Sequence, residues 1–341
     1  MHGLADCSTG WMIGTMSGSE DLLNIGAFII LYNTFAFGGQ LPAGILLDKI
    51  GNPKFIVAAA AALIVSGVML ASLSPVLAVI LAGTGSCFFH AGGGMMVLAV
   101  FPGKASMQGI FTGPGIAGLS IGGYLAIQNV DAGIILPALL ILSAMILATL
   151  KIPSAFFHLK KADSGLDHHD ILMIALLFAI SMRSAVWTVF DILHKGEYML
   201  AMWIGLAAFS GKLAGGYLAD FFGWRRYLTG ALCISAVLLS IDPAEPLLLL
   251  PGIALLQSAT PAAISGMHRL MPGQPGAASG LTLGLALAIG GLPFFSGLSP
   301  GDLGRWGPVL GILIAGVLFY FVLAKKTGVH ELREGKQVGH E

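Results

Sequence analysis

Long apolar runs, separated by short polar breaks, fill almost the whole chain. A run of about 20 apolar residues is long enough to cross the hydrocarbon core of a bilayer as an α-helix. The pattern therefore predicts an all-α integral membrane protein. Its twelve expected transmembrane helices lie near residues 2–18, 22–47, 54–74, 76–100, 105–128, 132–152, 170–193, 198–220, 225–241, 245–268, 276–298 and 305–325.

The longest and most polar break, residues 153–169, divides this pattern into two sets of six helices. We expect an N-terminal six-helix half at 1–152, a cytoplasmic linker at 153–169 and a C-terminal six-helix half at 170–326. Residues 327–341 are rich in polar side chains, and we expect them to form a disordered cytoplasmic tail. The other breaks are only a few residues long, so they leave no room for a soluble domain.

The composition supports a membrane protein and argues against several other classes. The chain is 56% hydrophobic and 10% charged, whereas soluble domains carry about 25% charged residues. The 48 glycines suit close packing of membrane helices, and the zero net charge argues against a nucleic-acid partner. The three cysteines lie in apolar segments, which indicates buried thiols rather than disulfides or a zinc site.

The sequence contains no phosphate-binding G-x-x-x-x-G-K-[ST] and no H-E-x-x-H motif. Its G-x-S-x-G matches, GLSIG at 118–122 and GLSPG at 297–301, lie inside or at the end of apolar runs rather than at a strand-to-helix turn. We therefore expect the protein not to be an enzyme and to use no cofactor, with a proton gradient as its energy source. Methionines and cysteines could bind a soft metal ion, and His2, Asp6, Cys7 and His90 would add ligands. Methionine in so apolar a chain is more often core filler, so we predict no metal site.

The lysines and arginines predict how the chain is oriented. Cytoplasmic loops of membrane proteins carry an excess of these residues. If both termini are cytoplasmic, the cytoplasmic breaks hold 13 of the 17, namely Lys49, Lys54, Lys104, Lys151, Lys160, Lys161, Arg225, Arg226, Arg269, Lys325, Lys326, Arg333 and Lys336. The outer breaks hold only Lys195 and Arg305. The bias predicts a multi-pass protein of the plasma or inner membrane with both ends in the cytoplasm.

One short charged phrase occurs twice, 172 residues apart. Residues 44–56 read GILLDKIGNPKFI, and residues 216–228 read GYLADFFGWRRYL. The two copies follow the second and the eighth predicted helix, which predicts two parallel repeats. The candidate gating residues in them are Gly44, Asp48, Gly51, Lys54, Gly216, Asp220, Gly223, Arg225 and Arg226. A carboxylate at a helix C-terminus opposes the helix dipole, so each aspartate should find a cation or a neighbouring helix N-terminus.

The repeated phrase, of the form G-x-L-x-D-x-x-G-x-[RK]-[RK], resembles the signature of the major facilitator superfamily (MFS). GPGIAGLSIGG at 113–123 resembles the antiporter-type motif of that superfamily. His2-x-x-x-Asp6 and the phrase FHAGGG at 89–94 look like the fosmidomycin-resistance-type exporter branch. The resemblance implies alternating access, a latch between the halves built from the repeated phrase, and a cavity lined by helices 1, 4, 7 and 10. We expect a single chain to be functional, because both halves are present.

Two ionisable side chains in the N-terminal half are candidates for proton coupling. An ionisable group inside a membrane helix should face a cavity or a partner, because its burial in lipid is costly. Asp6 in the first helix and His90 in the fourth could meet at similar depth, and a carboxylate–imidazole pair can carry a proton near neutral pH. The alternatives are that Asp6 is a helix-start residue near water and that His90 only packs.

The candidate solute-binding residues lie mostly in the C-terminal half. Arg183, Trp187 and Asp191 are spaced four apart, so they share one helix face. A guanidinium beside an indole suits an anionic or aromatic solute, although Arg183 could instead pair across the bundle. Lys212 could line the cavity or extend to the membrane edge, and Asn33 and Gln257 could line the path or join helices through hydrogen bonds.

These features predict a secondary transporter that moves a small organic solute, anionic or drug-like, by alternating access. Proton-coupled export, as an antiporter, is the favoured direction. The expected partners are the solute and the lipid bilayer. The alternatives are an uptake carrier for a metabolite or a metal ion, or a non-transporting membrane receptor on the same fold.

Overall fold

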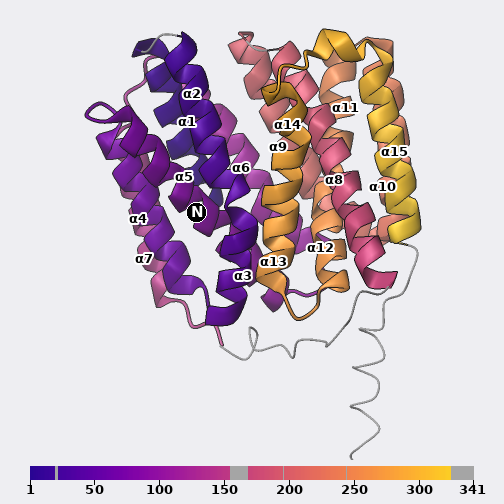
Figure 1. Cartoon of the computed structure of the whole chain (residues 1–341), viewed down its shortest axis with the longest axis horizontal. Helices are drawn as coiled ribbons and strands as arrows, with labels where there is room; N and C mark the ends of the chain where they lie inside the picture. The colour runs from indigo at the N-terminus through magenta and orange to yellow at the C-terminus, as the bar shows by residue number, and fades with distance from the viewer. Residues whose placement is uncertain (20–21, 154–167, 195, 243, 324–341) are drawn as a thin grey trace, which may run out of the picture.

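The protein is a bundle of helices (Figure 1). The computed structural model describes residues 1–19, 22–153, 168–194, 196–242 and 244–323, and these residues contain no β-strand. The elements are α1 (His2–Ser19), α2 (Leu22–Asn33), η1 (Thr34–Gly38), α3 (Gln40–Ile50), α4 (Lys54–Leu70), α5 (Pro75–Val100), α6 (Ala105–Ile127), α7 (Ile135–Thr149), α8 (His168–Leu193), α9 (Tyr198–Phe222), α10 (Trp224–Ile241), α11 (Pro246–Ser258), α12 (Thr260–Leu270), α13 (Pro275–Ser279), η3 (Gly280–Leu285), α14 (Ala286–Phe295), η4 (Pro300–Leu303) and α15 (Trp306–Val322).

Each of the twelve predicted ranges is occupied by helix in the described part of the chain. Seven of these helices are long and apolar enough to cross a membrane, and three shorter apolar helices accompany them. That the chain crosses the membrane twelve times stays a prediction. The expected linker at 153–169 and tail at 327–341 fall almost wholly outside the described residues.

Three of the expected continuous helices are interrupted, and the tenth is divided into α11 and α12 at Ala259. The second is split into α2 and α3 by the π-helical segment η1, and the eleventh is split into α13 and α14 by the π-helical segment η3. These two segments lie against each other. Gly284 in η3 faces the Phe37 carbonyl and the Gln40 side chain, so a side chain at Gly284 would overlap them. An apolar run shows that a helix is present, but a local change of helical pitch leaves no mark in its hydrophobic pattern.

The chain forms two groups of helices that meet along a central interface. Helices α1–α7 lie on the left in Figure 1, and most of α8–α15 lies on the right. The groups meet where α6 packs along α9 and where α13 packs on α3 and α5. Backbones approach closely at glycines there, because Gly109 faces the Lys212 carbonyl and Gly44 faces the Gly276 carbonyl. These crossings bring the functional candidates of both groups toward one another.

We expect Gly122→Ala to destabilise the protein and Gly123→Ala to have little effect. A Cβ on Gly122 would overlap the carbonyl oxygen of Cys7 in α1, whereas a Cβ on Gly123 meets nothing within 4 Å. Overpacking at a backbone contact typically costs about 1–3 kcal/mol. Thermal melting of both variants in detergent would test this. Equal melting temperatures for the two variants would contradict the α1–α6 packing described here.

Candidate functional site

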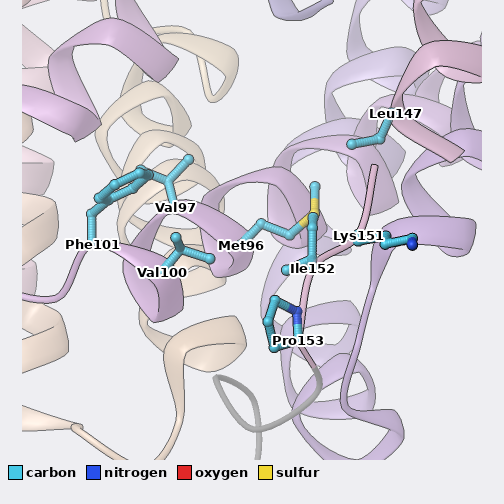
Figure 2. A pocket seen from close by; sticks show the side chains of 8 residues that line it. All are labelled: Met96, Val97, Val100, Phe101, Leu147, Lys151, Ile152 and Pro153. Carbon is cyan, nitrogen blue, oxygen red and sulfur yellow. The ribbon is translucent and has the colours of Figure 1, made fainter. Parts of the chain in front are cut away.

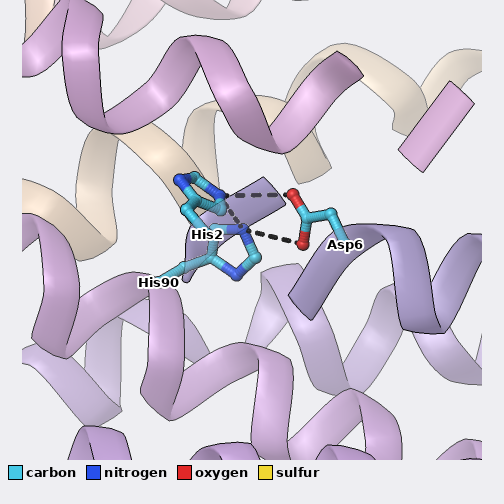
Figure 3. Close-up of side chains that lie close together, drawn as sticks. All are labelled: His2, Asp6 and His90. Atoms are coloured by element: carbon cyan, nitrogen blue, oxygen red, sulfur yellow. Dashed lines mark hydrogen bonds and ion pairs between the residues drawn. The ribbon is translucent and has the colours of Figure 1, made fainter. Parts of the chain in front are cut away.

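Three ionisable side chains meet where α1, α5 and α6 come together (Figure 3). His2 and Asp6 lie one turn apart on α1, and His90 comes from α5. His2 Nε2 lies 2.9 Å from His90 Nε2 and 3.2 Å from an Asp6 oxygen, and His90 Nε2 lies 3.4 Å from the other Asp6 oxygen. The predicted meeting of Asp6 and His90 is therefore observed in the geometry. We call His2, Asp6 and His90 the trio.

Glycine in α6 makes room for the trio. A side chain at Gly115 would overlap both the His2 ring and the Asp6 carboxylate. Gly115 lies in the phrase GPGIAGLSIGG, and Pro114 just before it lies inside the helix. The glycine-rich stretch of α6 therefore lets two ionisable side chains of α1 lie flat against its backbone.

The hydrogen bonds of the two imidazoles determine how many protons the trio holds. His2 Nδ1 lies 2.6 Å from the Phe111 carbonyl oxygen, and His90 Nδ1 lies 2.8 Å from the Ser86 carbonyl oxygen. His90 Nδ1 also lies 3.1 Å from the Ser86 hydroxyl. The contacts with the two carbonyls are shorter, and a carbonyl only accepts, so we assign a proton to both Nδ1 atoms. The Nε2–Nε2 contact then needs one further proton between the rings. The imidazole pair holds three protons and one positive charge, which the Asp6 carboxylate balances.

The trio also has the donor types of a metal site, since all three donor atoms lie within 4.8 Å of one another. Two nitrogens bound at about 2.1 Å to a tetrahedral ion lie about 3.4 Å apart. The Nε2 atoms are 2.9 Å apart, which is the length of an N–H···N hydrogen bond. The spacing fits a shared proton better than a metal ion.

A second cluster surrounds Arg183 of α8. Arg183 is only 3% exposed. Its Nη1 donates to Gln257 Oε1 at 2.8 Å, and its Nη2 donates to Ser184 Oγ at 3.3 Å. Its Nε is buried without a hydrogen-bond partner. Two predicted residues, Arg183 and Gln257, are thus joined, and both hydrogen-bond acceptors of this guanidinium are neutral side chains.

Lys212 of α9 is close enough to both the trio and Arg183 to interact with them electrostatically. Its ammonium interacts electrostatically with Arg183 and Asp6, and also with His90. The Lys212 backbone packs on Gly109 of α6, and the trio packs on Gly115 of the same helix. Six helical residues correspond to a rise of about 9 Å. The Lys212 backbone therefore lies at the crossing of α6 and α9, and its position in a cavity stays a prediction.

Three other predicted solute-binding residues do not join this cluster. The Trp187 indole packs against the hydrophobic core of α8–α15 rather than on the guanidinium of Arg183. Asp191 is exposed, two turns further along α8. Asn33 is half-buried at the end of α2, where η1 begins. Sharing a helix face with Arg183 was not sufficient, because the neighbouring helices cover only part of that face.

The two aspartates of the repeated phrase bind across the interface in the same way. Asp48 of α3 accepts hydrogen bonds from the backbone N–H groups of Gly276 and Ala277, at 2.7 and 2.8 Å. Asp220 of α9 accepts them from Ala105 and Ser106, at 3.0 and 2.9 Å. Each carboxylate binds backbone at the start of a helix in the other group, which is one of the two partners expected from the sequence. We call this end of the bundle the latch end.

Four of the other candidate gating residues in the repeated phrase end helices or contact neighbouring helices rather than the two carboxylates. Gly51 and Gly223 end α3 and α9 with φ of 89° and 86°, a conformation that favours glycine. Lys54 Nζ donates to the last carbonyls of α7, those of Ala148 and Leu150. The Arg225 guanidinium stacks on Tyr320.

Gly44 and Gly216 lie at the two crossings themselves. A Cβ at Gly44 would overlap the Gly276 carbonyl, and one at Gly216 would press on the Ala105 carbonyl. Arg226 is exposed, and Arg269 stacks on Trp224, which donates to Asp220. The latch end therefore carries a longer network than the phrase alone predicted.

A separate hollow lies between the end of α5 and the end of α7 (Figure 2). Its volume is about 410 Å³. The lining is apolar apart from Lys151, and consists of Met96, Val97, Val100, Phe101, Leu147, Lys151, Ile152 and Pro153. It contains none of the predicted site residues, and it suits an acyl chain better than a charged solute.

Sequence reasoning missed several residues of the site. His2 was singled out for its spacing from Asp6 but was not proposed to carry a proton. Ser279 of α13 donates to the His90 carbonyl and so joins the trio to the other group of helices. Gln108 and His268 are buried with polar atoms that lack a hydrogen-bond partner. For Gln108 and His268, the sequence signal was a single amide or imidazole inside an apolar run.

Comparison with known proteins gives partial matches in sequence. No protein-family model matches the chain. The curated protein YfnC of Bacillus subtilis (strain 168), an uncharacterised MFS-type transporter, is 38% identical over 117 residues. The match covers 30% of this chain and 29% of that protein, so it spans less than a third of the relative's length.

Solved structures match over nearly the whole chain. The Escherichia coli fucose:proton symporter FucP has a TM-score of 0.62 at 15% identity, covering 94% of this chain and 98% of that one. FucP in the outward conformation has a TM-score of 0.62 at 14% identity, with 94% and 97% covered. The human organic anion transporter MFSD10 has a TM-score of 0.64 at 14% identity, with 92% and 83% covered. At such identities the likeness shows the fold, so the chain has the fold of MFS transporters and is a multi-pass membrane protein.

Proposed function

We propose that the protein is a secondary transporter that moves a small organic anion across a membrane, with the trio as its proton-coupling site. The observation that carries this proposal is the 2.9 Å contact between His2 Nε2 and His90 Nε2 beside the Asp6 carboxylate, which a shared proton would explain. Burying ionisable side chains within a membrane costs free energy, and packing alone would not require them. One structural neighbour, the fucose:proton symporter FucP, is a proton-coupled transporter on the same fold.

Arg183 and Lys212 support an anionic solute. Arg183 is buried and Lys212 is half-buried, and the hydrogen-bond partners of Arg183 are the neutral side chains of Gln257 and Ser184. A guanidinium is suited to bind carboxylate or phosphonate oxygens in a fork. The human organic anion transporter MFSD10 is a second neighbour of the same fold. Gln257 holds the guanidinium in place, and the buried Nε–H of Arg183, which has no hydrogen-bond partner among the described residues, would donate to the solute.

Alternating access is the mechanism we propose, with the latch end closed in this conformation. Asp48 and Asp220 tie each group of helices to the other at that end only when the groups are close together. We propose that the two groups are parallel repeats that rock as units within one functional chain. The latch end also carries Lys49, Lys54, Lys104, Lys151, Arg225, Arg226 and Arg269, which favours the cytoplasmic side of the plasma or inner membrane.

The direction of transport has two candidates. The glycine-rich α6 and the resemblance to exporters favour export in exchange for protons. Uptake together with protons is favoured by the opposite charges of the anion and the proton. Measuring the sign of proton movement separates them.

The test is transport by the purified protein in liposomes under an imposed pH gradient. A panel of monocarboxylates, dicarboxylates, phosphonates, neutral sugars and divalent metal ions is tested, with an internal pH dye as the readout. We expect at least one organic anion to move protons and no response to metal ions. Proton movement with metal ions alone would favour a metal carrier, and no response to the panel would favour a non-transporting receptor; either result would overturn the proposal.

We expect Arg183→Ala to weaken binding of the transported anion by about 10- to 100-fold. A hydrogen bond to a charged group contributes about 1.5–3 kcal/mol, and 1.4 kcal/mol corresponds to a factor of ten. The half-saturation concentration in the liposome assay measures the effect. Lys49→Ala is the control, because Lys49 is exposed and is not among the candidate gating residues. An unchanged half-saturation concentration in Arg183→Ala would exclude this residue from the solute site.

A further inference from the structure

We infer that the anion and the proton bind at the same time, so that the protein is an anion–proton symporter. The inference deepens the proposed function and rests on it. It assigns the anionic group of the solute to Arg183 and Lys212 and the proton to the trio. It also favours co-transport over the exchange expected from the sequence.

The charges in the middle of the bundle are distributed unevenly. The trio is neutral overall, because one shared proton on its imidazoles balances the Asp6 carboxylate. Arg183 adds a cation from α8, and Lys212 of α9 adds a second basic group. The hydrogen bonds found for Arg183 go to Gln257 and Ser184, which carry no charge. The centre therefore has an excess of positive charge that a bound anion would offset.

Geometry places these groups close enough to interact. Gly115 of α6 lies against His2 and Asp6, and Gly109 of α6 lies against the Lys212 backbone. The ammonium of Lys212 interacts electrostatically with Arg183 and with Asp6. Like charges repel strongly in a medium of low dielectric constant. Without an anion, Lys212 opposes the proton on the trio, and with an anion bound this repulsion is offset.

The other groups near the trio do not carry a competing charge. Cys7 and Tyr32 interact with Asp6, and both are neutral hydrogen-bonding groups at physiological pH. Helices α2, α6 and α7, which pack on α1, contain no Asp, Glu, Lys, Arg or His in their described residues. The helix α4 adds Lys54, which is bound at the end of α7.

Around Lys212 the charged and titratable groups of the packed helices lie at the ends. On α9 itself, Asp220 binds the start of α6. The helices α10 and α12 contribute Arg225, Arg226, His268 and Arg269, all at the latch end. An anion that enters the centre therefore acts on Lys212, Arg183 and the trio together.

The coupling mode follows from the signs of the two ligands. Exchange requires that binding of the solute expels the proton, so that the two ligands oppose each other. A bound anion attracts a proton to the nearby imidazole pair instead. By thermodynamic reciprocity, the proton raises the affinity for the anion by the same factor. The solute that fits this site carries a compact acid group, which is a carboxylate, a sulfonate or a phosphonate.

The test counts protons during anion binding to the purified full chain in detergent. Benzoate and benzenesulfonate are the probes, since both stay ionised from pH 6 to 9, and the sulfonate and carboxylate arms separate the two acid groups. Isothermal titration in buffers of different ionisation enthalpy gives the number of protons taken up per anion. We expect uptake of up to one proton and at least tenfold tighter binding at pH 6 than at pH 9.

Two variants of Lys212 show whether this residue carries the linkage. In Lys212→Gln we expect the pH dependence of anion binding to fall to less than threefold. Lys212→Arg should retain it and controls for loss of folding. Proton release on binding, or pH-independent binding in the wild type, would overturn symport. If that result came with anion-driven proton movement in liposomes, the proposed function would stand and only this inference would fail.

Discussion

Replacing Asp6 with asparagine is expected to abolish proton-driven accumulation of solute. The carboxylate balances the proton held between His2 and His90, at 3.2 and 3.4 Å from their Nε2 atoms. Asparagine has nearly the same shape but no charge, so the shared proton becomes an uncompensated buried charge and is lost. Without that proton, the imidazole pair cannot couple the gradient to the solute site. We expect a decrease of more than tenfold in gradient-driven transport.

The liposome assay separates coupling from binding in this variant. Exchange of labelled for unlabelled solute, measured without a pH gradient, should persist in Asp6→Asn. Asp131→Asn is the matched control, because Asp131 is exposed in the loop between α6 and α7. Full proton movement in Asp6→Asn would remove the trio from the mechanism. A loss of both exchange and folding would be detected by the melting temperature in detergent.

The helical fold was predictable because its cause is visible in the sequence. Apolar runs bounded by polar breaks determine where helices lie when lipid is the solvent, and every predicted range is helical in the described residues. The interruptions at η1 and η3 were not predictable. They arise where Gly284 allows the Phe37 carbonyl and the Gln40 side chain to approach, and such an approach depends on which helices are neighbours in space.

The sequence predicted those site residues that are identified by their charge. It did not predict the roles that depend on how the helices pack. Asp6, His90 and Arg183 stand out because ionisable groups are rare inside membrane helices. The spacing of His2 and Asp6 indicated a shared face, but the role of His2 depends on the Phe111 carbonyl of another helix. Trp187 lies four residues from Arg183, which is the spacing between His2 and Asp6, yet it faces the hydrophobic core.

The repeated phrase carried more information than any single residue in it. Its two aspartates make the same cross-interface contacts, each with two backbone N–H groups of the other group of helices. Two occurrences at matching positions favoured a common role, whereas one aspartate could have bound water. The phrase did not indicate which groups its carboxylates would bind, since backbone N–H groups have no sequence signature.

Replacing Gly44 with leucine is expected to hold the latch end open. A Cβ at Gly44 would overlap the Gly276 carbonyl, which belongs to the other group of helices, and the overlap involves backbone that cannot turn aside. The closed conformation also needs the Asp48 carboxylate to reach Gly276 and Ala277, one turn further along α3. A leucine side chain separates these partners. We expect transport to fall more than tenfold, because one of the two alternating conformations is removed.

Accessibility of Ser279 measures this change directly. Ser279 is fully buried in the closed conformation and donates to the His90 carbonyl. In a background with Cys7, Cys87 and Cys233 replaced by alanine, Ser279→Cys should resist a water-soluble maleimide. Adding Gly44→Leu should make it react at least tenfold faster. Gly26→Leu is the matched control, since a Cβ there meets nothing within 4 Å. Equal reaction rates with and without Gly44→Leu would mean that the crossing at Gly44 does not close this end, and the two aspartate contacts would then have to act without it.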